Sequence, residues 1–243
     1  MTRSASTERP ALDPARFRDL VRRTLAHPRA HLAPTAETDR LPTAHQVPTA
    51  HRGPSDFDLN PDLPRDFARV ADAALAASRP IRPAAVLIPV ITRPELTLLF
   101  TLRTNDLPAH AGQIAFPGGK TEPFDADPLA TALREAHEEI GLDPSHVEPL
   151  GTLDLYLTGT GYRITPVIGL VDPGAPLTLD PREVADAFEV PLGFLMDPAN
   201  HQRHSRIIGG QERHFHAMPF GDRFIWGATA GILRNMHERL FSP

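Results

Sequence analysis

The chain has 243 residues, of which 41% are hydrophobic, and it carries a formal net charge of −5 and no cysteine. This length allows one large domain or two small ones with a packed core, the acidic balance leaves no basic footprint for nucleic acid, and the lack of cysteine excludes disulfides, zinc–thiolate sites and thiol nucleophiles. No apolar run approaches the roughly 18 residues of a membrane span and no secretory signal is evident, so we expect a cytoplasmic protein without nucleic-acid or membrane partners.

Residues 1–80 form an N-terminal extension that prolines interrupt throughout. We predict short helices over 14–26 and 64–78, and a mobile linker over 30–60. We expect the extension to pack on the following domain, or on a partner subunit, rather than to carry chemistry, and a homodimer stays open. Removal of residues 1 to 60 should then leave a soluble and active domain.

The pattern becomes β-like at residue 81, where we place the start of the main domain, residues 81–243. A continuous apolar run over 84–91 predicts a central strand, with which 96–103 pairs across a turn. Beyond residue 142 we predict, in chain order, strands over 147–157 and 162–171, a short helix over 181–188, a further element over 190–195, a His- and Arg-rich segment over 201–216, a strand near 223–226 and a helix over 228–240. Together these elements predict an α/β sandwich.

One helix between these strands is well delimited. Asp127 is suited to the N-cap, Pro128 to the first helical position and Gly141 to the left-handed residue that ends a helix. The apolar residues recur at helical spacing and predict a core-facing stripe, formed by Leu129, Ala132, Leu133, Ala136 and Ile140. Three glutamates lie on another face of the same helix, namely Glu135, Glu138 and Glu139.

Clustered glutamates on a helix ordinarily form a solvated acidic face. Here Gly118 and Gly119 precede the helix, and glycines let a backbone turn sharply and approach a ligand closely. Such a loop and helix supply carbonyl and carboxylate oxygens, the hard ligands that Mg²⁺ and Mn²⁺ prefer. The stretch therefore predicts a metal-dependent site for a polyphosphate.

The segment from Gly119 to Leu142 resembles the signature of the Nudix hydrolases: a glycine, an early acidic residue, and then Arg-Glu-apolar-x-Glu-Glu-x-Gly-apolar, here Arg134 to Leu142. The chain departs from the signature twice, because the early acid is Asp125 rather than glutamate and the gap from Gly119 to Arg134 is one residue too long. The resemblance implies a mixed β-sheet between helices.

The resemblance also implies the roles of the site residues. The Gly119 carbonyl, Glu135, Glu138 and Glu139 would hold Mg²⁺ or Mn²⁺, with Glu139 as the principal ligand. Arg134 would lock the glutamates in place through a bidentate pair. Glu183 would position or deprotonate the attacking water, or would be an ordinary acid at a helix start.

A second stretch, from Leu99 to Phe116, resembles the motif that precedes this signature in coenzyme A pyrophosphatases, although Pro108 stands where that family has an arginine. Further similar stretches extend the resemblance over about residues 81–240. It implies hydrolysis of coenzyme A to 4′-phosphopantetheine and adenosine 3′,5′-bisphosphate. Arg103, His110 and Gln113 would contact the substrate.

Two aromatic residues leave alternatives open: Tyr162 and Trp226 would stack on adenine, or they belong to the core. The substrate also stays open, because the missing arginine at Pro108 keeps ADP-ribose or another nucleoside diphosphate derivative in view. A third alternative is a domain that binds a nucleotide without cleaving it. The intact glutamate set argues against that alternative, since a pure binder has no need of three mutually repelling carboxylates.

Overall fold

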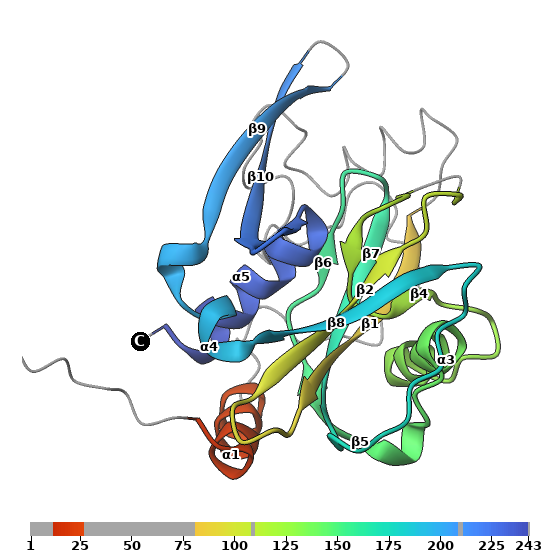
Figure 1. Ribbon diagram of the computed structural model, residues 1–243, viewed down its shortest axis with the longest axis vertical. Coiled ribbons are helices and arrows are strands. Elements are labelled where there is room, and N and C mark those ends of the chain that lie inside the picture. The colour runs from red at the N-terminus through yellow and green to blue at the C-terminus, as the bar shows by residue number, and fades with distance from the viewer. Residues whose placement is uncertain (1–11, 27–80, 108–109, 209–210, 243) are drawn as a thin grey trace, which may run out of the picture.

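The computed structural model describes residues 12–26, 81–107, 110–208 and 211–242, and these form a mixed β-sheet that lies between helices (Figure 1). This confirms the predicted α/β fold with a mixed sheet. The central order is β3-β2-β1-β7-β5, while β4 pairs with β1, β6 with β7 and β8 with β2. The strands of this sheet are β1 (Arg82–Ile91), β2 (Thr97–Arg103), β3 (Ile114–Ala115), β4 (Gly118–Lys120), β5 (Val147–Thr152), β6 (Tyr156–Leu157), β7 (Tyr162–Val171) and β8 (Val184–Pro191).

The central strand β1 forms because its run of apolar residues is buried along nearly its whole length. It lies antiparallel to β2 and β4, and parallel to β7 over ten registered pairs from Arg82↔Tyr162 to Ile91↔Val171. The predicted pairing of the first two strands is therefore confirmed. The sheet has one hydrophobic cluster on each of its two faces.

Helix α3 (Pro128–Ile140) covers one face and turns the predicted stripe toward it, with Ala132 and Ile140 fully inaccessible to solvent and Leu129 and Leu133 partly buried. The other face is covered by α5 (Ala228–Leu240) and α1 (Pro14–Leu25), and the two sides are distinct in Figure 1. No helix among residues 12–26, 81–107, 110–208 and 211–242 is long and apolar enough to cross a membrane.

Helix α1 confirms the first predicted helix and belongs to the core of the domain. Phe17 and Val21 are fully buried in the same hydrophobic cluster as residues of α5, and Arg18 donates two hydrogen bonds of 2.8 Å to the Glu148 carboxylate. The expectation that residues 1 to 60 are dispensable therefore conflicts with the packing. The predicted linker over 30–60 and helix over 64–78 lie outside the described residues.

The prediction of a helix over 181–188 is wrong. From residue 184 the chain forms β8, which lies antiparallel to β2 from Arg103↔Val184 to Thr97↔Pro191. Pairing with the sheet supplies the backbone hydrogen bonds that a helix would have made locally. The next segment, 190–195, ends in the short helix α4 (Leu192–Leu195), followed by a 3₁₀ turn at Pro198–Asn200.

The His- and Arg-rich segment forms most of a second sheet. Strands β9 (Gln202–Ile208) and β10 (Gln211–Phe220) form a hairpin that projects from the body of the molecule in Figure 1. Strand β11 (Arg223–Trp226), which confirms the predicted strand, pairs with β10. The sheet order is β11-β10-β9.

Candidate active site

The loop and helix of the signature form as their sequence predicts. Asp127 caps α3, its carboxylate accepting a hydrogen bond of 2.8 Å from the Ala130 N–H, and Gly141 ends the helix with a left-handed φ of 66°. The φ of Gly118 is 154°, and a Cβ at this position would lie 2.5 Å from the Ala85 carbonyl oxygen. A Cβ at Gly119 would collide with the Glu135 carboxylate. Gly118 thus lets β4 lie close to β1, and Gly119 lets α3 lie directly against β4.

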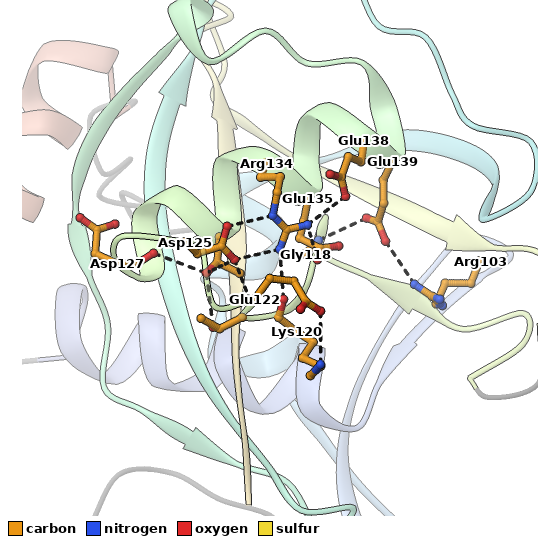
Figure 2. Close-up of polar contacts among 12 residues, drawn as sticks. Arg103, Gly118, Lys120, Glu122, Asp125, Asp127, Arg134, Glu135, Glu138 and Glu139 are labelled. Atoms are coloured by element: carbon orange, nitrogen blue, oxygen red, sulfur yellow. Dashed lines mark hydrogen bonds and ion pairs between the residues drawn. The ribbon is translucent and has the colours of Figure 1, made fainter. Parts of the chain in front are cut away.

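Glu139 is an almost fully buried acidic group of the site, with 3% of its surface exposed. One carboxylate oxygen accepts a hydrogen bond of 3.2 Å from the Gly118 N–H, and the other pairs with Arg103 Nη1 at 3.2 Å (Figure 2). Burial is the main cause that raises the pKa of Glu139 to about 7, and the neighbouring charges of Glu135 and Glu183 raise it further. A buried carboxylate among like charges favours a cation.

Arg134 lies on the neighbouring side of the helix and joins it to the preceding loop. Its guanidinium makes a bidentate pair with Asp125 at 2.9 Å for both contacts, and single contacts of 2.9 Å to Glu135 and to Glu138. A further hydrogen bond of 3.1 Å goes to the Lys120 carbonyl. The bidentate partner is therefore the early acid of the signature, whereas a glutamate was expected.

Asp125 is the functional residue that the sequence analysis noted without giving it a role. Its side chain is only 3% exposed, and the Arg134 guanidinium holds the pKa of this carboxyl well below its usual range. The carboxylate also accepts hydrogen bonds from the Glu122 N–H at 2.9 Å and the Thr131 hydroxyl at 3.0 Å. Aspartate has a shorter side chain than the glutamate of the signature, and the loop is one residue longer than in the signature. Together these two departures still place a carboxylate beside Arg134.

The acidic groups are chemically suited to a divalent cation, although their side chains are not arranged as a complete set of metal ligands. Burial raises the pKa of Glu135 as well, while Arg134 opposes this shift. The Glu138 side chain is 58% exposed and turned toward Arg134. In the part of the chain that the structure describes, no three His, Asp or Glu side chains are grouped to hold a metal ion together. The ligand set of Gly119, Glu135, Glu138 and Glu139 stays a prediction.

Three residues of the upstream motif lie together at the edge of the site. The Arg103 N–H donates to the Gln113 carbonyl at 3.0 Å, and the Gln113 side chain lies 2.9 Å from His110 Nδ1. Glu183 is exposed at the turn before β8, where its carbonyl accepts from the Thr104 N–H at 3.0 Å. Arg103 is registered with Val184, the residue after Glu183, so the fold brings Glu183 to the site.

The two aromatic candidates lie on other elements than the glutamates. Tyr162 begins β7, and its ring lies under the Arg82 guanidinium, 3.9 Å from the ring centroid to the Arg82 Cζ. Trp226 ends β11, and its ring packs edge-on against Phe215 at a centroid distance of 5.2 Å.

Comparisons with known proteins show the family of this chain. The sequence model of the NUDIX domain matches residues 81–208. The chain is 42% identical over 159 residues to a protein of Yersinia pestis (strain Pestoides F) described as "Uncharacterized Nudix hydrolase NudL", covering 65% of this chain and 80% of that one.

Solved structures give weaker likenesses. The NUDIX domain of Shewanella oneidensis NrtR complexed with ADP ribose is 17% identical, with a TM-score of 0.43, and covers 70% of this chain and 97% of that one. A C. elegans Ap4A hydrolase is 15% identical, with a TM-score of 0.40, over 45% of this chain and 80% of that one. The matched domain model and the 42% identical relative, together with the glycine loop, Arg134 and the glutamates of α3, make this chain a member of the Nudix hydrolase family.

Proposed function

We propose that this Nudix hydrolase cleaves the pyrophosphate bond of coenzyme A or a derivative, giving 4′-phosphopantetheine and adenosine 3′,5′-bisphosphate. The observation that carries the proposal is the contact of the coenzyme A-type motif with the signature helix. Arg103 of that motif pairs with Glu139 at 3.2 Å, and Gln113 bonds to the Arg103 backbone at 3.0 Å. The motif thus lies where a diphosphate beside the glutamates would meet it.

The residues of the site have distinct roles in this proposal. Glu135, Glu138, Glu139 and the Gly119 carbonyl would hold Mg²⁺ or Mn²⁺, which when bound neutralises the charge of the diphosphate. Arg134 acts as a positioning residue, because its contacts hold Glu135 and Glu138 beside the loop. Arg103 offers a guanidinium to a phosphate oxygen, and planar guanidinium donors suit that geometry.

Glu183 is the candidate base for the attacking water. Its exposed carboxylate lies close enough to Glu135 and Glu139 to raise the pKa of both groups. Water forms a new O–P bond, the bridging O–P bond breaks, and the proton lost by the water goes to the Glu183 carboxylate. Arg103 stabilises the negative charge that develops on the phosphate oxygens.

The deciding experiment is product identification by mass spectrometry after incubation with coenzyme A and Mg²⁺ or Mn²⁺. We expect a product pair of 4′-phosphopantetheine and adenosine 3′,5′-bisphosphate, formed about 10²–10³ times more slowly by Glu139→Gln under the same conditions. Parallel assays with dephospho-coenzyme A, ADP-ribose and NADH rank the substrates. Higher kcat/KM for ADP-ribose than for coenzyme A would overturn the substrate assignment, and binding without any cleavage would overturn the assignment of an enzyme.

A further inference from the structure

One face of the second sheet carries a continuous row of rings, contributed by all three strands: Phe224 and Trp226 of β11, Phe215 of β10 and His204 of β9. The His204 ring lies 5.6 Å from Phe224 and 5.9 Å from Phe215, and the Phe215 ring lies 5.2 Å from Trp226, all between centroids. The strand register explains the row, because His204 is directly opposite Phe215. We name these four side chains the ring row.

The ring row lies on the face of the sheet opposite to the core. Successive side chains of a strand alternate between faces, and the alternate residues Met218 and Ile225 are fully buried in the cluster that includes α5. Phe224 is 41% exposed, and the other three rings are half-buried. A patch of aromatic side chains on an outward face is a candidate binding surface.

The charge around the ring row is positive, whereas the chain as a whole carries a net charge of −5. On the face of the ring row the hairpin carries Arg206 and Arg213, which are registered with each other, while its one acidic residue, Glu212, is registered with Ile207 on the other face. The Arg206 guanidinium lies over Trp226, 6.0 Å from the ring centroid. A flat ring beside a guanidinium is complementary to a ligand that joins a planar base to a phosphate.

The second sheet also adjoins the candidate active site. The Thr229 hydroxyl, three residues after Trp226, donates to the Ile114 carbonyl of β3 at 3.1 Å. Ile114 is registered with Leu102 of β2, next to Arg103. Strand β11 also contacts β3, so the short strand β3 lies between β11 and β2, the strand of Arg103.

We propose that the ring row is the subsite for the adenine nucleotide half of the substrate, with the base stacked on Trp226 and a phosphate paired with Arg206. The identity of the whole substrate rests on the proposed function, but the subsite requires only an adenine nucleotide.

The test uses the single tryptophan of the chain as its reporter. The full-length protein is titrated with adenosine 3′,5′-bisphosphate in EDTA, so that no turnover occurs, and Trp226 fluorescence is recorded. We expect saturable quenching by this nucleotide and none by 4′-phosphopantetheine, which carries a phosphate without a base. Absence of saturable quenching overturns the subsite, even if coenzyme A is cleaved. Quenching without coenzyme A cleavage leaves the subsite standing and overturns the proposed function.

Variants separate stacking from a structural role. We expect Trp226→Ala to raise the KM for coenzyme A by at least about fivefold with little change in kcat, and Trp226→Phe to restore the KM. Arg206→Ala should weaken the binding of adenosine 3′,5′-bisphosphate by about tenfold and should leave the binding of adenosine almost unchanged. Ile207→Ala is the matched control, since Ile207 lies on the same hairpin, is 68% exposed and belongs to the other face. An equal loss in Ile207→Ala, or a dimer that Trp226→Ala dissociates, would overturn the proposal.

Discussion

The two faces of the mixed sheet carry side chains of different size and charge. On the α3 face small residues such as Ala85, Ala132 and Ala136 let the helix approach the strands closely, and acidic groups line its exposed margin. On the opposite face large side chains such as Phe17, Phe100 and Met218 join α1, α5 and the second sheet in one cluster. The comparison teaches that the chemistry is placed by close backbone approach on one face, while the other face supplies most of the long-range packing.

The largest expected effect tests the packing face. Phe17→Ala removes a fully buried ring from the larger cluster and should lower the free energy of unfolding by about 3–5 kcal/mol. Denaturant unfolding measures this loss, and Leu177→Ala, at a residue 40% exposed, is the control. The kcat of the folded fraction should stay unchanged. If Phe17→Ala keeps the free energy of unfolding of the wild type, the packing of α1 does not stabilise the domain.

The next effect tests the chemical face. Glu139→Gln keeps the size of the side chain but removes its charge and replaces one acceptor oxygen with an NH₂ donor. It should therefore retain the fold and lose about 10²–10³ in kcat, the cost of removing one strong transition-state stabiliser. Glu122→Gln is the control, because Glu122 pairs with Lys120 at 3.2 Å outside the helix. Wild-type turnover in Glu139→Gln with an unchanged melting temperature would contradict the assignment.

A smaller effect is expected at the joint between loop and helix. Asp125→Asn leaves Arg134 without its bidentate partner and should cost about 1.5–3 kcal/mol of stability, the usual value of hydrogen bonds to charged groups. Activity should fall as well, since Arg134 also contacts Glu135 and Glu138. Asp125→Glu provides the comparison, because it restores the acid of the family signature. If Asp125→Asn has the melting temperature of the wild type, the Asp125–Arg134 pair does not stabilise the fold.

The smallest effect concerns pH on the packing face. Burial lowers the pKa of His216 from 6.5 to about 4, and the nearby charges of Arg234 and His201 lower it further. A histidine with a lowered pKa in the folded state contributes its full stability above pH 6.5, and this stability is lost as the pH falls toward 4. The melting temperature of the wild type should therefore drop more between pH 7 and pH 4.5 than that of His216→Gln. If the melting temperatures of the wild type and His216→Gln fall equally with pH, the His216 ring is not buried in its neutral form.

Local signals in the sequence were sufficient for the chemical face. The cap at Asp127, the stop at Gly141 and the glycines of the loop act over a few residues, and the structure has each of them as predicted. The bidentate partner of Arg134 was missed because the signature gave Asp125 no role beyond its position. A spacing of nine residues from loop to helix carries no periodicity that would reveal such a contact.

Strand β8 and the second sheet could not be predicted in the same way, because they depend on contacts between distant parts of the chain. Residues 184–191 have no strong alternation, and they become a strand because β2 offers a free edge about 90 residues earlier, as in Leu99↔Glu189. The hairpin of the second sheet was visible only as a His- and Arg-rich composition. Its ring row depends on the cross-strand pairing His204↔Phe215, which no local pattern indicates.

The contacts of Arg134 have a consequence for motion. One guanidinium holds the Lys120 carbonyl, Asp125, Glu135 and Glu138 together, so that the irregular loop and the helix are cross-linked without a covalent bond. The loop should open only when the helix opens. In hydrogen exchange, the Glu122 amide, which donates to Asp125, should then be protected on the timescale of α3 rather than that of a surface turn. The order of the loop is therefore established before any substrate arrives.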